Sequence, residues 1–371
     1  VGNRRGYNSR GQLNIKKVFM NKWILGVSVI LFLLTSCSKD NDEGTPQSDD
    51  IMNGGAELKF SSDVLSSIVV DVDPTRSSTR APLSSFENNS QIGIYGIPGV
   101  DGGKNESCNL RDCKFESDFQ KYLFNGRYTY VSGYDELQSE FQATYPSRAN
   151  PALYLYGYYP YTDKAEYREI AGASQWAVPW QLDTDNMANT IDYLYTGEKF
   201  VRYSEWGLNP ITLEFQHAFG RVDFKFYTTS MAVLNKNYTV ESVTITCISG
   251  KKGWMAIANG SMSFTTEQFT STYKVVDGSV AWNIPGEPAA RFMFPHTQTL
   301  IKEVTCVMRS GAGEVKKYTI YDQYSGYTIP VRQGEITNMN VKFLPKDASI
   351  SSAVDVNSWD SNTTIDKDVK L

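Results

Sequence analysis

The two histidines are the first residues to test for catalytic chemistry, because the 371-residue chain contains no others. His217 and His296 lie far apart in the sequence, and each adjoins apolar residues typical of a strand. A catalytic serine or cysteine needs a histidine base, a carboxylate that orients it and a nucleophile in an exposed turn. The chain has no Gly-x-Ser-x-Gly turn. We therefore expect strand-end histidines held by backbone hydrogen bonds, and no enzyme.

The remaining residues give little support for a metal or cofactor site. Cys108 and Cys113 can close a small disulfide in a loop, whereas Cys247 and Cys306 share strand faces with apolar residues and form either a bridge or two buried thiols. Zinc is disfavoured, because cysteine ligands usually come as close pairs supported by histidine. No predicted helix follows the glycines at 99–103, as phosphate binding would require. We predict no metal and no cofactor.

Two aromatic clusters raise the question of sugar binding. Tyr154 to Tyr159 and Trp176 to Trp180 contain several rings each. A row of exposed rings would form a stacking platform for a glycan. Alternation along a strand turns half of the rings inward, which favours the interpretation that alternate rings fill the core of a β-sandwich while the others cover its outside.

The charge balance argues against a nucleic-acid partner. Lysine and arginine total 36 against 41 aspartates and glutamates, which gives a net charge of -5. Such a chain lacks the basic field that would concentrate on a phosphate backbone.

The N-terminal segment is typical of a bacterial lipoprotein precursor. Basic residues up to Lys22 precede an apolar run from Trp23 to Leu34, and Leu34-Thr35-Ser36-Cys37 has the form of a lipobox. We predict upstream residues and a signal peptide over 1–36, with translation starting at Met20, and acylation of Cys37 that anchors the chain in the cell outer membrane. Residues 37–55 are polar and acidic. They form a flexible tether, which is either a solvated linker or an export tag for the outer leaflet.

The body of the chain predicts an all-β fold. Short runs rich in Val, Ile, Thr, Tyr and Phe alternate with turn residues along its whole length, and no crossover helices are evident. We predict two antiparallel β-sandwich domains in tandem over 56–210 and 211–346, followed by a strand-like tail over 347–371. A polar stretch with two prolines at 73–82 interrupts the first domain.

A set of short motifs, in this order, resembles the fimbrillin family of type V pilus subunits, including its Mfa-like members. The motifs are Cys37, Thr79-Arg80-Ala81, Gln91-Ile92-Gly93-Ile94-Tyr95-Gly96, Tyr158-Tyr159-Pro160-Tyr161, Asp192-Tyr193-Leu194-Tyr195, Leu213-Glu214-Phe215-Gln216-His217-Ala218-Phe219-Gly220-Arg221-Val222, Phe294-Pro295-His296-Thr297, Gly334-Glu335-Ile336-Thr337-Asn338-Met339-Asn340-Val341 and Trp359. Together they cover nearly all of the mature chain.

The resemblance implies two transthyretin-like sandwiches, lipoprotein export and assembly by strand exchange. Proteolysis after Arg80, or second after Arg76, would leave Ala81 as the new N-terminus and free the first strand, which lies within 56–72. An uncut linker is the alternative. A strand from the next subunit would then fill the open groove. Its source would be the tail, whose alternating residues are Ile350, Val354 and Val356. The tail either inserts into a neighbour in this way or packs on its own domain.

The function expected from this resemblance is that of a structural or adhesive subunit of a surface fimbria. Its partners would be other fimbrillin subunits, the outer membrane through the lipid anchor, and a ligand on a host or bacterial surface. The tail continues past Trp359, so the position in the fibre, as shaft, tip or anchor subunit, stays open. The alternative is a surface glycan-binding lipoprotein that uses the aromatic strands.

Overall fold

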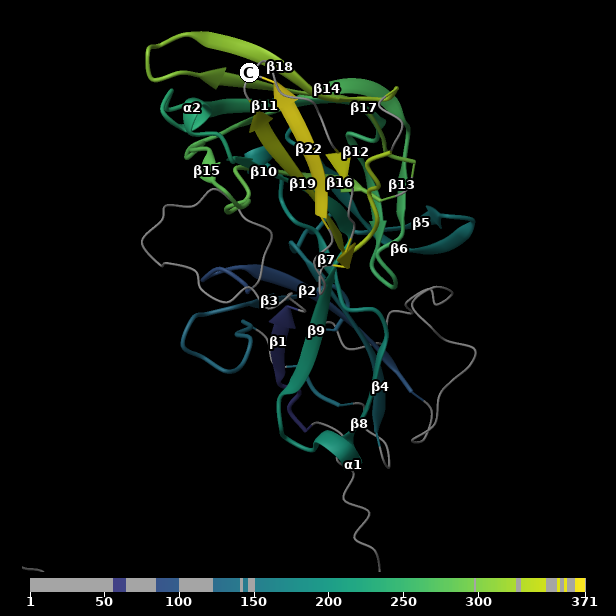
Figure 1. Cartoon of the computed structure of the whole chain (residues 1–371). Coiled ribbons are helices and arrows are strands. Elements are labelled where there is room, and N and C mark those ends of the chain that lie inside the picture. The colour runs from purple at the N-terminus through teal and green to yellow at the C-terminus, as the bar shows by residue number, and fades with distance from the viewer. Residues whose placement is uncertain are drawn as a thin grey trace, which may run out of the picture. The chain divides into compact units, whose positions relative to one another are not determined.

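The computed structural model of the chain describes most of residues 56–370. The described ranges are 56–64, 85–99, 123–140, 143–145, 151–296, 298–324 and 328–344, together with the backbone of three strands at 352–353, 357–358 and 364–370. Their secondary structure is almost entirely β, which confirms the predicted fold class (Figure 1). Helix is confined there to single turns: η1 (Met187–Asn189), α1 (Tyr203–Trp206) and α2 (Met231–Leu234). None of these is long and apolar enough to cross a membrane.

Seven strands from the first half of the described chain form one sheet. Its strand order is β1-β9-β7-β4-β2-β3, and β8 also pairs with β4. The strands are β1 (Phe60–Val64), β2 (Gln91–Pro98), β3 (Gly126–Thr129), β4 (Ala152–Tyr159), β7 (Leu194–Tyr195), β8 (Lys199–Arg202) and β9 (Ile211–His217). β9 shows the period of two that one buried face requires, with Ile211, Leu213 and Phe215 buried and Glu214 and Gln216 exposed.

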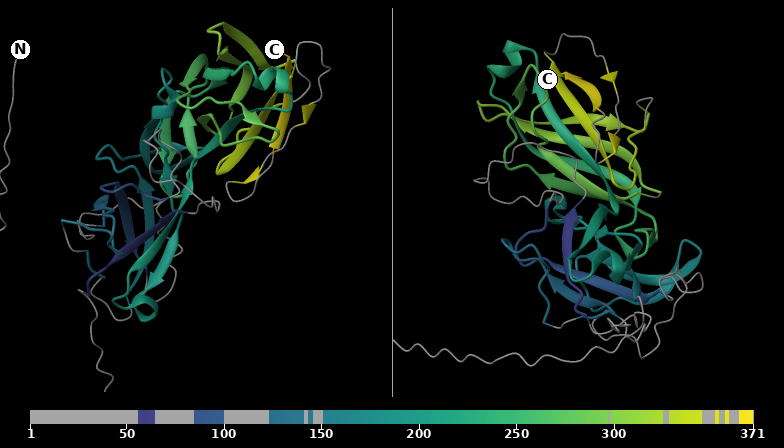
Figure 2. Two further views of the ribbon diagram at one scale, coloured as in Figure 1. Left: turned by 60° about the vertical axis from the view of Figure 1, so that its left-hand side comes forward. Right: turned by 90° about the horizontal axis from the view of Figure 1, so that it is seen from below.

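Two sheets from the second half share a larger core. The seven-stranded one has the order β15-β10-β19-β22-β20, with β16 on β10 and β21 on β19; the four-stranded one has the order β14-β11-β17-β18. The strands are β10 (Phe219–Thr228), β11 (Thr239–Ser249), β14 (Glu267–Lys274), β15 (Ala281–Trp282), β16 (Ala290–Pro295), β17 (Leu300–Arg309), β18 (Val315–Asp322), β19 (Glu335–Leu344), β20 (Ser352–Ala353), β21 (Asn357–Ser358) and β22 (Thr364–Lys370). Figure 2 shows the C-terminal strands in yellow beside the green strands of this part of the chain.

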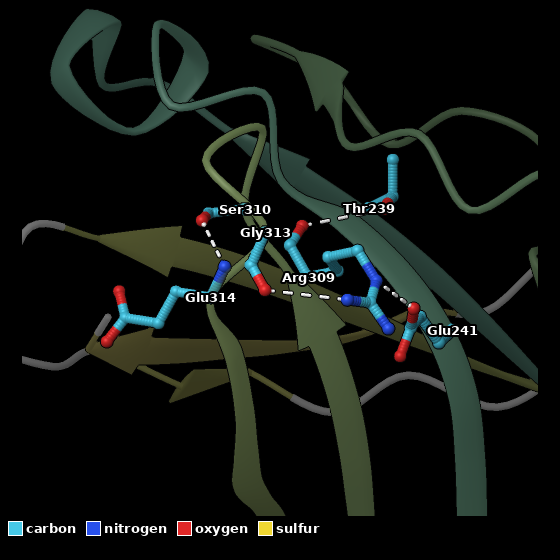
Figure 3. A network of polar contacts seen from close by, with 6 residues as sticks. All are labelled: Thr239, Glu241, Arg309, Ser310, Gly313 and Glu314. Atoms are coloured by element: carbon cyan, nitrogen blue, oxygen red, sulfur yellow. Dashed lines mark hydrogen bonds and ion pairs between the residues drawn. The ribbon is translucent and has the colours of Figure 1, made fainter.

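Hydrogen bonds and an ion pair connect β11 to the hairpin of β17 and β18, near the turn of the hairpin (Figure 3). The Arg309 guanidinium forms an ion pair with Glu241 and donates a hydrogen bond of 3.4 Å to the main-chain oxygen of Gly313. The Thr239 hydroxyl donates to the Arg309 main-chain oxygen at 3.4 Å. Because the Arg309 side chain is 48% exposed, solvent screens its ion pair, and the network contributes mainly to the register of the hairpin.

Strand pairing crosses residue 210, where the sequence places the domain boundary. β9 pairs with β1 and β7 of the first sheet. β6 (Ala173–Gln181) pairs with β12 (Lys252–Ala256) in a further sheet, which has the order β13-β12-β6-β5 and also contains β5 (Glu166–Ile170) and β13 (Met262–Phe264). The division into domains at 210 stays a prediction.

Parallel pairing supplements the antiparallel pairing that the sequence predicts. The pairs β1–β9, β10–β15, β10–β19 and β19–β22 are parallel. A parallel pair needs a long crossover connection. Between β1 and β9 that connection contains β2 to β8 and no long helix among its described residues. Other strands therefore supply the crossover here.

Candidate functional site

β1 is a five-residue strand at the end of the strand order, beside β9 (Figure 1), and Leu137 bonds to it on the other side. Its parallel register runs from Phe60 opposite Ile211 to Val64 opposite Phe215. On the other side, the Leu137 main-chain N–H donates to the Phe60 oxygen at 2.7 Å. Main-chain hydrogen bonds thus hold β1 along its β9 edge and at Phe60 on the other edge, and they are independent of its side chains.

The inward side chains of β1 belong to the core of the first sheet. Leu58, Phe60 and Val64 are 5%, 1% and 3% exposed. The Phe60 ring packs edge-on against Tyr128 with 5.1 Å between ring centroids. These positions define a groove on β9 with three apolar pockets, which we call the β1 groove. Any strand that replaces β1 has to fill the same pockets.

The outward side chains of β1 and of the residue before it make two favourable polar contacts and one unfavourable pairing. The Ser61 hydroxyl donates to Thr212 Oγ1 at 3.0 Å, and the Lys59 ammonium lies 3.2 Å from a Glu136 carboxylate oxygen. Asp63, however, lies opposite Glu214 in the register, and both side chains are exposed. Like charges in directly opposed positions destabilise a sheet. A hollow of about 470 Å³ adjoins Ser61 and Ser62.

The two histidines are buried or half-buried, each beside a hydrogen-bonding partner. His217 Nδ1 lies 2.8 Å from an Asp192 carboxylate oxygen, and the two side chains are 1% and 3% exposed. Burial lowers the pKa of His296, whose Nδ1 lies 3.3 Å from the main-chain oxygen of Ala218. The expected backbone partner is therefore found for His296, and His217 pairs with a carboxylate. A substrate in solvent does not reach that buried pair.

The aromatic clusters are buried and do not form an exposed platform. In β4 every residue from Ala152 to Tyr158 is buried, so both faces of the strand are covered, and the prediction that half of the rings lie outside is wrong. Trp180 is 2% exposed, and Trp176 is half-buried against Tyr95 and Phe124. The glycan-binding alternative therefore has no exposed row of rings in these two clusters.

The two described cysteines are buried free thiols. Cys306 lies opposite Val243 in the register, whereas Cys247, on the same strand as Val243, lies opposite Ile301. The two sulfurs are thus offset along the strands, and burial raises each thiol pKa to about 12. Of the two alternatives left open by the sequence, the structure shows buried thiols. Among the described residues no group of three or more His, Cys, Asp or Glu side chains is arranged to hold a metal ion.

Most of the predicted site residues lie outside the described ranges. These are Cys37, Cys108, Cys113, Arg76, Arg80, Ala81, Ile350, Val354 and Val356. Of the predicted removable segment 56–72, the structure describes 56–64, and it places β1 there. Sequence reasoning missed the partners of this strand, namely Thr212, Glu214 and residues 137–145. Their only signal was the alternation of Ile211, Leu213 and Phe215, which identifies a strand without its neighbour.

Comparisons with known proteins agree with this architecture. One solved structure, a candidate cell adhesion protein from Bacteroides uniformis, is 12% identical with a TM-score of 0.50, over 82% of this chain and 99% of that one. Another, from Bacteroides ovatus and described in the same words, is 16% identical with a TM-score of 0.50, over 83% and 99%. These likenesses show the fold alone. No curated protein matches the chain. The sequence model of the fimbrillin-like family matches residues 79–359, most of the chain, and the chain therefore belongs to the fimbrillin-like family.

Proposed function

We propose that the chain is a structural or adhesive subunit of a cell-surface pilus, exported as a lipoprotein and assembled by strand exchange after proteolytic removal of its first strand. Membership of the fimbrillin-like family supports the first part. The observation that carries the second part is β1, a short edge strand whose inward side chains fill the core of the first sheet. β1 would be the strand that leaves.

The covalent connection supports a removable β1. Residues 65–84, which include Arg76 and Arg80, join β1 to the rest of the first sheet. A cut after either arginine leaves β1 attached only through non-covalent contacts. Burial of one large apolar side chain stabilises a fold by about 1.5–3 kcal/mol. Loss of Leu58, Phe60 and Val64 therefore leaves an apolar groove whose stability depends on a replacement strand.

The exposed edge of β9 explains why that replacement would be a strand. Without β1, the main-chain groups of Ile211 to Phe215 on that edge lose their partners. An unpaired edge binds an extended segment by β-augmentation, in which main-chain hydrogen bonds give affinity and alternate side chains give specificity. Repetition of this step between subunits makes a fibre.

The lipid anchor belongs to the export step of the same proposal. Acylation of Cys37 would hold the precursor at the outer membrane, and residues 37–55 would be the tether between the anchor and β1. Cleavage after Arg80 then releases anchor, tether and β1 together, so that maturation and release from the membrane are one event.

Mass spectrometry of pili sheared from the cell surface tests this function. We expect mature chains that begin at Ala81 in high-molecular-weight fibres, and acylated Cys37 in the membrane fraction. Arg80→Ala should retain the lipidated precursor and abolish the fibres, while the matched control Arg76→Ala should leave them intact. Fibres whose subunits still contain β1 would overturn strand removal, and a chain found only as a lipidated monomer would overturn the polymer-forming role.

A further inference from the structure

We propose that residues Ile350–Val354 of one chain replace Phe60–Val64 of a second copy, residue for residue and parallel to β9. This inference rests on the proposed function and adds the register in which the tail would enter the β1 groove. It follows from the contacts that β1 makes on β9, compared position by position with the sequence of the tail.

The two segments have the same pattern. β1 reads Phe60-Ser61-Ser62-Asp63-Val64, and the tail contains Ile350-Ser351-Ser352-Ala353-Val354. The first, third and fifth positions point to the same side of a strand. In both segments these positions carry a large apolar residue, a serine and a valine.

The inward positions preserve the packing of the groove. Ile350 would enter the pocket of Phe60, which is 1% exposed, and Val354 would enter that of Val64. Val64 and Val354 are identical in shape, and isoleucine is a smaller apolar side chain than phenylalanine. Ser352 would reproduce Ser62 between them, so no charged group is buried.

The outward positions retain one contact of β1 and remove its conflict. Ser351 would replace Ser61, whose hydroxyl donates to Thr212 Oγ1 at 3.0 Å, and its own hydroxyl could make the same hydrogen bond. Ala353 would replace Asp63, which lies opposite Glu214 with both side chains exposed. The incoming strand therefore lacks the like-charge repulsion that the native strand carries.

One position outside the five favours β1 instead. In the same register Ala348 would lie where Leu58 is 5% exposed, which leaves that pocket partly empty. This difference makes a gain of function testable, because a leucine at 348 should fill the pocket.

The last strand of the tail is a poorer occupant. If Ile365 of β22 entered the Phe60 pocket, Val369 would take the place of Val64, but Lys367 would take the inward position of Ser62. An inward ammonium without a carboxylate partner is costly. Within one chain Ser352 and Ala353 pair with Lys367 and Asp366 of β22, and exchange requires that this pairing opens.

Cysteine cross-linking between copies tests the register. Chains with Thr212→Cys and Ser351→Cys, produced in the cell that naturally makes and processes them, should give polymers linked by disulfides, visible as a ladder without reductant and lost on reduction. The matched control Thr212→Cys with Ser352→Cys points its second thiol to the other face and should give no ladder. Ser61→Cys with Thr212→Cys should close a bond within the uncut precursor, which shows that position 212 accepts a partner.

The outcomes separate this inference from the function on which it rests. A ladder through position 351 and none through 352 supports the register. Polymers that cross-link through 352 or through Asp366→Cys, but not through 351, retain strand exchange and overturn the register. Failure of the parent chain to polymerise, with β1 retained, overturns both. As a second measurement, Ala348→Leu should raise the temperature at which the fibres dissociate, whereas Ser349→Leu, which faces outward, should not; the reverse result also overturns the register.

Discussion

Asp63 is the residue of β1 that fits its neighbour least well, because Glu214 is its register partner and both side chains are exposed. We expect Asp63→Asn to raise the free energy of unfolding of the uncut chain by about 0.2–1 kcal/mol, measured by chemical denaturation. Glu214→Gln should give a similar gain. The double variant should gain little more than either single variant, whereas fully additive gains would contradict a repulsion between the two residues.

The buried thiols should be unreactive while the chain is folded. Burial raises the pKa of Cys247 and of Cys306 to about 12, so both are neutral near pH 8, and alkylation requires the thiolate. Peptide mapping after iodoacetamide treatment should show neither cysteine modified in buffer and both modified in denaturant. Modification of the folded chain at the rate of a free thiol would contradict their burial.

The same pKa shift gives the sign of a pH dependence. The folded state holds these thiol protons more tightly than the unfolded state, whose thiols have a pKa of about 8.5. Their contribution to stability is therefore complete below that pH and decreases as the pH rises toward 12. Replacement of Cys306 by Ala should flatten the decrease in a series of unfolding measurements across this range.

At the residue scale, sequence predicts exposure and burial better than partners. The burial of Trp180 and Cys247 follows from the alternation of apolar residues around them. The pairing of His217 with Asp192 does not, because no periodicity connects residues 25 positions apart on β9 and before β7. The like-charged pair of Asp63 and Glu214 was missed for the same reason.

At the scale of elements, Gly220 shows why one residue of the family motif is a glycine. A Cβ atom built on Gly220 in β10 would lie 2.4 Å from the main-chain oxygen of Arg332. Main chain cannot move aside as the end of a side chain can, so Gly220→Ala should lower the free energy of unfolding by about 1–3 kcal/mol. Gly286→Ala is a matched control, since its Cβ would lie 3.3 Å from the Ala281 methyl carbon, and thermal unfolding compares the two. Equal effects would contradict the steric explanation.

The course of the chain around Gly220 also shows what an element pattern leaves undetermined. Alternating residues predict strands on both sides, and β9 and β10 are found there. The sequence allows a bent strand or a hairpin. In the structure β9 and β10 do not pair within the fully described range 151–296, and they belong to different sheets. Periodicity gives the faces of a strand, whereas its partner depends on contacts distant in sequence.

At the scale of the whole molecule, the parallel pairs were beyond the reach of sequence. Parallel neighbours usually indicate helical crossovers, and the absence of helical periodicity favours antiparallel sheets. In the described residues the connections from β1 to β9 and from β10 to β19 contain other strands and single helical turns. In the proposed register the incoming strand takes the direction of β1, which runs parallel to β9.

In the proposed exchange each subunit has an accepting groove and a donating tail, and the two can be disabled separately. Ser61→Cys with Thr212→Cys keeps β1 in its groove after cleavage, so the subunit can donate its tail but cannot accept one. Ile350→Asp with Val354→Asp places charges at the apolar positions of the tail, so the subunit can accept a strand but cannot donate one.

Each variant alone should remain monomeric. A mixture should stop at dimers, because the donor's own groove is closed and the acceptor's own tail is inactive; size-exclusion chromatography with light scattering measures this. Reduction of the disulfide should restore polymers only in the first variant. Fibres in the oxidised mixture, or a mixture that stays monomeric while the reduced first variant polymerises, would contradict assembly through the β1 groove and the 350–354 segment.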